Sequence, residues 1–395
     1  MRNTGKRWKA AAVGLAAALA LTACGSGSGN GNGRDGSHEL TIGLVSSFSG
    51  SAASYGEAER ASLQTAVAYA NKNQIAKIDG KPVTFRIKEY DSAYDPTKAV
   101  TVTRQALDLD GVRYLEVLGG GIVPAVQPLV NKENALLFAT AAGDDFIGKD
   151  QSKTFRPLYD TREALKAILE HRRSEGGLAG RLVLLYPDDD LGQSLSPDAA
   201  KIGEDLGFTA HTELVGRDVT DFAPVMSKIA KTTDIIDFGP LPPSQQAVAI
   251  KQARQLGYKG IFVFSDTLIL DTLLKTVSAR DIEGSLSAPA LEAQVALTPE
   301  GKAWAASVRK KTGQIDGWTA VVYDNLLLLA AAVNDAQTLD PAKVADALPK
   351  QKVHGILGEV SYGGADKYGI DRVMKLPYAV SEVRSGKAEL VTSGS

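Results

Sequence analysis

The chain has 395 residues, of which 44% are hydrophobic and 23% charged, and its formal net charge at pH 7 is -2. This is the composition of a globular protein, and the length exceeds what one hydrophobic core usually holds, so two domains are expected. The near-neutral charge gives no reason to expect nucleic acid as a partner, and a single cysteine excludes intramolecular disulfides and thiolate metal clusters.

Residues 1–23 have the pattern of a secretory signal peptide. Basic residues from Arg2 to Lys9 precede an apolar run over residues 10–20, which is shorter than the about 20 residues that a permanent membrane helix needs. The sequence Leu21-Thr22-Ala23-Cys24 follows directly and resembles the lipobox of bacterial lipoproteins. The resemblance implies a diacylglyceryl lipid on Cys24 that anchors the chain to the outer face of the cell membrane. An ordinary signal peptide with a chance cysteine is the alternative.

Residues 24–38 are predicted to form the lipidated cysteine and a tether. Residues 25–36 contain no apolar side chain and alternate glycine with serine, asparagine and other polar residues, which is the composition of a flexible coil. Such a tether would let the folded body move beside the membrane while it stays attached through Cys24.

From residue 40 onward, short β-branched runs alternate with longer segments that carry apolar residues at helical spacing. The expected elements are strand 40–45, helix 55–71, strand 83–90, helix 96–109, strand 114–118, helix 123–133 and strand 135–139. Asp95-Pro96 is interpreted as a helix start, with Asp95 as the cap. This alternation is typical of a parallel sheet with helices on its faces.

The alternation restarts after Phe155-Arg156-Pro157. The expected elements are helix 162–173, strand 181–186, helix 196–206, strand 209–213, helix 222–231, strand 235–238, helix 244–256 and strand 260–264. The rest of the chain is expected to form helices 299–312, 318–336 and 341–347 and strands 359–362 and 376–383. Two similar units predict an α/β protein with two doubly wound parallel-sheet lobes, and the remainder is expected to return to lobe one and then cross again.

Several motifs resemble the type I periplasmic binding proteins of the leucine/isoleucine/valine-binding class. The similarity covers about residues 39–392, and the order and spacing of the motifs match the family. The motifs are Ile42-Gly43-Leu44-Val45-Ser46-Ser47-Phe48-Ser49-Gly50 with Tyr55-Gly56, Tyr90-Asp91-Ser92-Ala93-Tyr94-Asp95-Pro96, Asp190-Leu191-Gly192, Thr220-Asp221-Phe222, Gln252-Ala253-Arg254-Gln255-Leu256-Gly257 and Gly355-Ile356-Leu357-Gly358-Glu359-Val360-Ser361-Tyr362.

The resemblance implies a receptor for an ABC transporter, in which two lobes joined by three hinge strands close on a small-molecule solute and then dock on a permease. Lobe one is expected at 39–157 plus 288–375 and lobe two at 158–287 plus 376–392. The hinges would lie near residues 156–159, 287–289 and 375–377. We expect a monomer without a cofactor.

In open parallel sheets, ligands bind beyond the carboxyl ends of the strands, where helix N-termini direct unpaired backbone N–H groups outward. Here these loops are residues 46–55, 119–121, 140–144, 187–192, 239–241 and 265–267. The candidate ligand-binding residues are Ser49, Tyr55, Gly120, Gly121, Thr140, Ala141, Ala142, Gly143, Leu241, Asp266 and Trp318.

Gly119-Gly120-Gly121 ends a strand and opens a helix, so its amides can approach a carboxylate closely, although a tight turn explains the glycines equally well. Thr140-Ala141-Ala142-Gly143 would supply a second set of amides. The resemblance implies that amino-acid-binding relatives hold the α-carboxylate with serine and threonine hydroxyls at these loops. This chain has mainly glycine and alanine there, which leaves backbone donors for an anionic group.

Asp266 falls where amino-acid-binding relatives place an acid that pairs with the α-ammonium. Tyr55 and Trp318 fall where relatives present aromatic rings to the solute, which suits an apolar or planar group. Two alternatives stay open from the residues themselves: Asp266 as a helix N-cap or turn residue, and Trp318 as a core residue.

We expect neither an enzyme nor a metal site. The chain lacks the nucleophile elbow, the His-Glu-x-x-His motif and a Cys-His pair outside the signal peptide, and its four histidines show no metal spacing. Asp188-Asp189-Asp190 is interpreted as a solvated loop, since it lacks the spacing of a calcium loop. The predicted function is a lipid-anchored, extracytoplasmic substrate-binding protein of an ABC importer for an amino acid or related carboxylate. The alternative is a sensor that reports to a membrane receptor or kinase.

Overall fold

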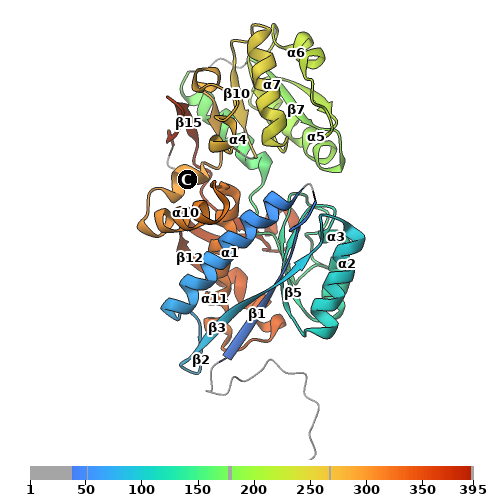
Figure 1. Cartoon of the computed structure of the whole chain (residues 1–395), viewed down its shortest axis with the longest axis vertical. Coiled ribbons are helices and arrows are strands. Elements are labelled where there is room, and N and C mark those ends of the chain that lie inside the picture. Colours follow the sequence, from blue (N-terminus) through green and yellow to red (C-terminus); the bar gives the residue numbers. More distant parts are fainter. Residues whose placement is uncertain (1–37, 51, 177–179, 267, 393–395) are drawn as a thin grey trace, which may run out of the picture.

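Residues 38–50, 52–176, 180–266 and 268–392 are described by a computed structural model of the chain. They form two α/β bodies arranged end to end (Figure 1). Cys24, the predicted signal peptide and most of the predicted tether lie outside the described residues. His38, predicted as the last residue of the tether, is instead the first residue of a strand.

The first body contains a six-stranded sheet in the order β2-β3-β1-β4-β5-β6. All neighbouring strands are parallel except the short β2, which pairs antiparallel with β3. The strands are β1 (His38–Ser46), β2 (Lys77–Ile78), β3 (Lys81–Asp91), β4 (Tyr114–Leu118), β5 (Leu136–Thr140) and β6 (Thr154–Phe155).

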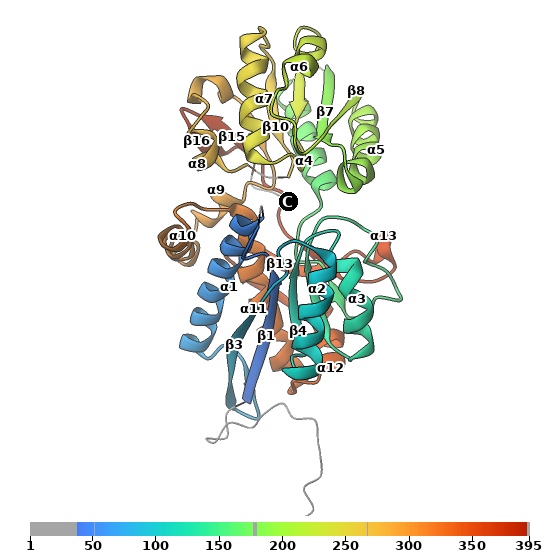
Figure 2. The same cartoon turned by 45° about the vertical axis from the view of Figure 1, so that its right-hand side comes forward.

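Helices cover both faces of the first sheet, because side chains along each strand alternate between two cores. Tyr114 of β4 packs on the side of α1 (Ala53–Asn73), whereas Leu115 packs on the side of α2 (Pro96–Arg104) and α3 (Val123–Lys132). Figure 2 shows α1 and α2 on opposite sides of β1. The helix predicted over 96–109 changes into a π-helical turn, Gln105–Leu109, after α2.

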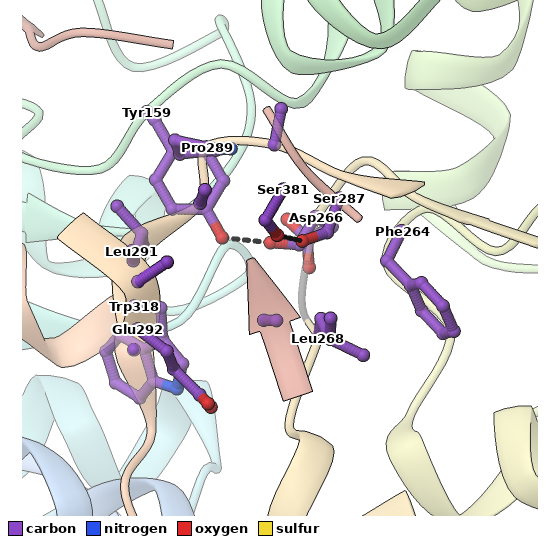
Figure 3. A pocket seen from close by; sticks show the side chains of 15 residues that line it. Tyr159, Phe264, Asp266, Leu268, Ser287, Pro289, Leu291, Glu292, Trp318 and Ser381 are labelled. Atoms are coloured by element: carbon purple, nitrogen blue, oxygen red, sulfur yellow. Dashed lines mark hydrogen bonds between the residues drawn. The ribbon is translucent and has the colours of Figure 1, made fainter. Parts of the chain in front are cut away.

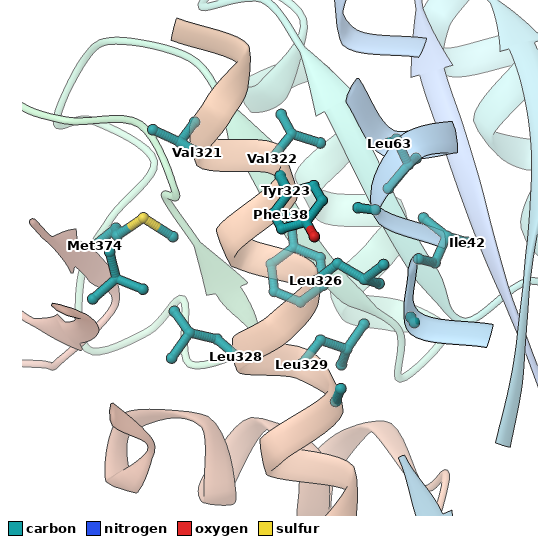
Figure 4. Close-up of a cluster of buried hydrophobic side chains, with 14 of the residues drawn as sticks. Ile42, Leu63, Phe138, Val321, Val322, Tyr323, Leu326, Leu328, Leu329 and Met374 are labelled. Carbon is teal, nitrogen blue, oxygen red and sulfur yellow. The ribbon is translucent and has the colours of Figure 1, made fainter. Parts of the chain in front are cut away.

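The core on the α1 side is built around α11 (Ala320–Ala336), which is apolar on nearly every face and buried, as expected for a helix enclosed in a domain. Figure 4 shows α11 between Ile42 and Leu63 on one side and Met374 on the other. Residues 291–375 pack on the first sheet, where they form α9 (Leu291–Val295), α10 (Pro299–Thr312), α12 (Pro341–Ala347), α13 (Ala365–Tyr368) and the small sheet of β12 (Lys352–Gly355), β13 (Gly358–Gly363) and β14 (Val373–Lys375).

The second body contains a seven-stranded sheet in the order β16-β15-β11-β10-β9-β7-β8. Its strands are β7 (Arg181–Pro187), β8 (Thr209–Val215), β9 (Ile235–Asp237), β10 (Ile261–Phe264) and β11 (Leu286–Ser287), followed by the antiparallel edge pair β15 (Ser381–Arg384) and β16 (Lys387–Leu390). Its helices are α4 (Thr161–Ser174), α5 (Asp190–Asp205), α6 (Ala223–Ile229), α7 (Pro243–Gln255) and α8 (Leu270–Leu273).

The chain passes between the two bodies three times. Residues 156–160 lead from β6 to α4, residues 288–290 lead from β11 to α9, and residues 376–380 lead from β14 to β15. The strand predicted over 376–383 is therefore wrong in its first half. Pro377 has no N–H to donate to a ladder, and this segment spans from one sheet to the other.

The acidic run before α5 also differs from its interpretation as a solvated loop. The Asp189 side chain accepts a hydrogen bond from the Gly192 N–H at 3.0 Å and caps a helix that begins at Asp190, several residues before the predicted start. An aspartate is a favourable N-cap because its carboxylate satisfies a free N–H of the first turn. The start predicted at Asp95-Pro96 is confirmed, since Asp95 accepts from the Lys98 N–H at 2.7 Å.

Candidate functional site

The loop between β1 and α1 is fixed by Asp91, the last residue of β3. Its carboxylate accepts from the Phe48 N–H at 2.9 Å, the Ser49 hydroxyl at 2.7 Å and Lys98 Nζ at 2.9 Å. Burial opposes ionisation, but these donors prevail and hold the pKa of Asp91 below its usual range. The hydroxyl of Ser49, a predicted ligand residue, is thus engaged in holding this loop.

Two loops of the first sheet bring backbone N–H groups together. Gly120 lies against the Ala142 carbonyl, since a Cβ atom on Gly120 would meet that oxygen at 3.3 Å. Within residues 38–50, 52–176, 180–266 and 268–392, no group accepts a hydrogen bond from the N–H of Gly120, Gly121, Ala142 or Gly143. These four amides, beside the start of α3, form a cradle suited to a carboxylate.

The side chains of the neighbouring residues point away from this amide cradle. The Thr140 hydroxyl donates to Glu116, which is buried in β4, so Thr140 offers only its backbone to the site. Ala141 is buried in the core beside α3. Burial and the nearby charge of Glu59 raise the pKa of Glu116 well above its ordinary value. The signal for this buried acid was the single charged residue in the apolar strand Tyr-Leu-Glu-Val-Leu.

Tyr94 covers one side of the cradle and was not singled out from the sequence. Its ring is packed on Gly119, where a Cβ atom would lie 3.0 Å from the ring edge. Tyr94 keeps 47% of its surface exposed, and partial desolvation, opposed by the charge of Arg217 and helped by that of Asp189, raises its pKa. Arg217 and Asp189 belong to the second body and form an ion pair at 2.5 Å. Tyr94 therefore lies where the two bodies face each other.

Tyr55 and Trp318 form a second group. Their ring centroids are 6.4 Å apart at an interplanar angle of 70°, an edge-to-face arrangement. Burial, followed by the charges of Asp316 and Asp266, raises the pKa of Tyr55 to about 12. Asp266 follows β10 of the second body, so the Tyr55 hydroxyl is within electrostatic range of an acid from the opposite body.

Asp266 is held by the first crossing segment and the helix after it. Its Oδ1 accepts from the Thr161 hydroxyl at 3.0 Å, and its backbone carbonyl accepts from the Tyr159 hydroxyl. The next helix, α8, has Ile269 as its N-cap residue, so Asp266 does not cap it. Its position is set by contacts to the crossing segment, which favours an inter-body role over a simple turn.

A cavity of about 20 Å³ lies between the two bodies at the crossing segments. Figure 3 shows Asp266, Ser287 and Ser381 on one side of it and Glu292 and Trp318 on the other. This volume accommodates about one water molecule, so an amino-acid-sized solute would need the bodies to be arranged differently. Glu292 was not predicted, because nothing in its local sequence separates it from an ordinary helix residue.

Leu241 does not join the other predicted residues. Its side chain is 1% exposed and lies in the core of the second body. Its N–H donates to the Phe238 carbonyl at 3.0 Å, and its carbonyl accepts from Gln246 at 2.7 Å. All of its groups are therefore occupied, and we remove it from the candidate site.

The described residues hold no group of three or more histidine, cysteine or acidic side chains placed to bind a metal ion. Of the helices in those same ranges, none has the length and apolar content that crossing a bilayer requires.

Comparison with known proteins identifies the family to which this architecture belongs. Residues 39–388 match the model of a family described as "Periplasmic binding protein". The chain belongs to this family. Its members are solute-binding proteins rather than enzymes, which confirms the predicted α/β two-lobe fold and the expectation that the chain is not an enzyme.

Among curated relatives, the chain is 23% identical over 358 residues to "Leu/Ile/Val-binding protein homolog 2" of Brucella abortus (strain 2308), which covers 88% of this chain and 91% of the relative. Two solved structures show the same fold. A solute binding protein of an ABC transporter from R. palustris, in complex with 4-hydroxybenzoate, has a TM-score of 0.73 at 19% identity and covers 90% of this chain and 96% of its own.

The second structure is the branched-chain amino acid transporter substrate binding protein LivJ from Streptococcus pneumoniae in complex with isoleucine. It has a TM-score of 0.70 at 21% identity and covers 89% of this chain and 99% of its own. As a periplasmic binding protein, the chain belongs to a family of extracytoplasmic proteins that bind small-molecule solutes.

Proposed function

We propose that this chain is a lipid-anchored substrate-binding protein of an ABC importer that captures an amino acid or related small carboxylate by closure of its two lobes. The observation that carries this proposal is that the two bodies contribute complementary binding groups, donors for an anion in the first body and an acid in the second. In the first body, four backbone amides without an acceptor among the described residues form the cradle, and Tyr94, which packs on Gly119 beside it, acts electrostatically on Tyr55 of the aromatic pair. From the second body, the charge of Asp266 also reaches the Tyr55 hydroxyl.

The solute carboxylate would accept hydrogen bonds from the amides of Gly120, Gly121, Ala142 and Gly143, next to the positive end of α3. A solute ammonium would pair with Asp266. Such a pair strengthens as closure removes water from around it. Because the two partners of the solute belong to different bodies, binding both ends shifts the equilibrium toward the closed arrangement.

Asp266 favours an amino acid over an aromatic acid. The two solved complexes contain isoleucine and 4-hydroxybenzoate, both of which carry a carboxylate, but isoleucine alone adds an ammonium. An aromatic acid such as 4-hydroxybenzoate offers no cation to the Asp266 carboxylate. We therefore place the solute of this chain among the amino acids.

The test is a thermal-shift screen of the mature chain against amino acids, aromatic acids, small amides and short peptides. A solute at 100 times its dissociation constant is expected to add about 2.7 kcal/mol of stability. Asp266→Asn and Trp318→Ala should each weaken the binding of the identified solute. Ser227→Ala on the exposed side of α6 is a matched control that should leave binding unchanged.

Two outcomes would contradict the proposal. If no compound of the panel raises the melting temperature, the importer function loses its support. If a solute binds but both variants keep the affinity of the unmodified chain, the solute lies elsewhere and the assigned site is wrong.

A further inference from the structure

Three carboxyl groups surround the aromatic pair Tyr55 and Trp318. Asp266 and Glu292 line the cavity between the two bodies, and Asp316 directly precedes the short helix that carries Trp318. The charge of Asp316 acts on both the Tyr55 hydroxyl and the Glu292 carboxyl. The Asp316 carboxyl therefore lies within electrostatic range of both, and the acids and the rings form one cluster.

Two buried oxygens of this cluster accept no hydrogen bond from the residues that the structure describes. They are Oε1 of Glu292, which lines the cavity, and Oδ1 of Asp316, a residue that is 2% exposed and directly precedes the cavity residues Gly317 and Trp318. A buried acceptor without a partner is costly, and an ionised one more so. A ligand that enters beside Glu292 and Trp318 would supply the missing donor.

The charges of neighbouring acids also disfavour the ionised form of Glu292. Burial, followed by the charges of Asp271 and Asp316, raises the pKa of Glu292 to about 8. Arg309 opposes this rise, but it is already paired with Asp271 at 2.9 Å. Burial raises the pKa of Asp316 to about 7, although hydrogen bonds from Trp318 and Gln314 act against the rise. Within the described part of the chain, neither Glu292 nor Asp316 forms a salt bridge with a basic side chain.

The lining of the cavity favours a cation over an anion. Asp266 and Glu292 contribute carboxyl groups to it, and no lysine, arginine or histidine of the described residues lines it. Trp318 also lines the cavity, and its ring would attract a cation further.

We propose that the solute is a basic amino acid whose side-chain ammonium binds between Glu292, Asp316 and the rings of Tyr55 and Trp318. This inference rests on the proposed function, in which the amide cradle binds the carboxylate and Asp266 the α-ammonium. The side-chain ammonium would donate hydrogen bonds to the buried oxygens of Glu292 and Asp316, and those bonds would be charge-assisted. A basic side chain thus supplies a cation to both acids.

The experiment compares L-ornithine with L-norleucine by calorimetric titration of the mature chain. The two side chains have the same length and shape and differ in ending with an ammonium or a methyl group. L-lysine, whose side chain is one methylene longer, tests a larger distance between the α-carbon and the side-chain ammonium. The better of L-ornithine and L-lysine is expected to bind about 10- to 100-fold more tightly than L-norleucine.

Substitutions in the cluster test whether it causes the preference for a basic amino acid over L-norleucine. Glu292→Gln and Asp316→Asn should each reduce the preference for the basic amino acid and change the affinity for L-norleucine little. Asp205→Asn is the control, because this exposed carboxylate is paired with Lys201 on α5 of the second body and takes no part in the cluster. It should keep the preference.

A pH series gives an independent readout. The cation binds the ionised forms of Glu292 and Asp316, so the affinity for the basic amino acid should rise from pH 6 to pH 8, more than that for L-norleucine. The other titratable or charged groups that act on this cluster are Asp271 and Arg309 at Glu292, and Asp266, Tyr94 and Arg217 at Tyr55. L-norleucine carries the same α-ammonium and carboxylate, so the difference between the two pH series isolates the side-chain ammonium.

The outcomes separate the two proposals. If L-norleucine binds as tightly as L-ornithine and L-lysine, the basic side-chain site is overturned and the proposed function stands. If no amino acid binds, both are overturned. If KCl alone stabilises the chain as much as the basic amino acids do, the site belongs to an inorganic cation, and this inference is overturned.

Discussion

Glu59 and Glu116 are two buried carboxyl groups joined through Thr140 beneath the amide cradle. Glu59 accepts a hydrogen bond from the Ser46 hydroxyl at 2.5 Å, and Glu116 accepts one from the Thr140 hydroxyl. Hydrogen bonding by Thr140 also lowers the pKa of Glu59, against the effect of burial. No basic side chain in the described part of the chain forms a salt bridge with either acid. Burial therefore raises the pKa of Glu59 to about 7, and ionisation of the pair works against the folded state.

Glu59→Gln is expected to flatten the pH dependence of stability. The folded-state pKa of Glu59 lies above that of the unfolded chain, so its stabilising contribution is complete below about pH 4.5 and is lost as the pH rises through about 7. The loss is at most about 1.4 kcal/mol per pH unit. Urea unfolding at pH 5, 6 and 7 should show a smaller decline for the variant than for the unmodified chain.

Glu57→Gln, on the exposed face of the same helix, is the control. It should decline with pH as the unmodified chain does. Equal slopes for Glu59→Gln and the unmodified chain would show that Glu59 does not carry the buried proton.

The site could be predicted from the sequence only where a residue sits in a recognisable loop. Tyr55, Trp318 and Asp266, to which the resemblance gives a ligand-binding role, lie close together, although Trp318 is only 8% exposed and also belongs to the core of the first body. The glycine loop presents amides without an acceptor among the described residues. Glu292 and Asp316 could not be found, because their importance depends on buried oxygens and on neighbours far along the chain. Leu241 shows the opposite error, since a residue in a suitable loop can still face the core.

At the scale of elements, a cluster of ion pairs connects the two bodies beside the first crossing segment. Arg162 of α4 contacts Asp144 of the first body at 2.6 Å and Asp160 at 2.7 Å. The buried Arg156 also contacts Asp144, at 2.9 Å, and Lys367 approaches Asp144 at 3.2 Å. Hydrogen bonds from Tyr368 and the two arginine charges outweigh burial and hold the pKa of Asp144 below its usual range.

Asp144→Asn is expected to lower the free energy of unfolding by about 1 to 3 kcal/mol, because buried Arg156 and Arg162 lose a charged hydrogen-bond partner. It should also change the balance of open and closed arrangements, since Asp144 joins the bodies. Urea unfolding measures the first effect and small-angle X-ray scattering without solute the second.

Lys367→Met removes a half-exposed partner of the same acid and should cost under about 1 kcal/mol. If the two variants are equally stable, or if the scattering of Asp144→Asn matches that of the unmodified chain, these ion pairs do not hold the arrangement of the bodies.

Most elements could be predicted from hydrophobic spacing and caps, and helix 341–347 has the predicted bounds. The errors lie where tertiary structure overrides local pattern. The apolar residues of 376–380 look like a strand, yet they serve as a connection between sheets. The three successive aspartates at 188–190 look like a polar loop, yet Asp189 caps α5 and Asp190 is its first residue.

At the scale of the whole molecule, the lipid and the solute site are predicted to be independent. The candidate site lies within residues 38–392, whereas Cys24 precedes them and is separated by the glycine-rich segment. A flexible tether, as the composition of residues 25–36 predicts, would let the folded body reach a permease from a fixed anchor.

Cys24→Ser should move the chain from the membrane fraction to the soluble extracytoplasmic fraction while leaving solute affinity unchanged. Fractionation of cells that express either form, followed by titration of the purified chains, measures both. Ser26→Ala in the same segment is the control and should stay with the membrane. Equal membrane association of the Cys24→Ser chain would exclude the lipid anchor.

The three crossings also have a consequence for biosynthesis. The second sheet receives its edge strands β15 and β16 from the last part of the chain, after the first body has received residues 291–375. Until they arrive, β11 is an unpaired sheet edge, which is a template for pairing with other chains. A nascent chain released before Ser381 would keep that edge open, so secretion of the intact C-terminal hairpin is itself a safeguard against aggregation.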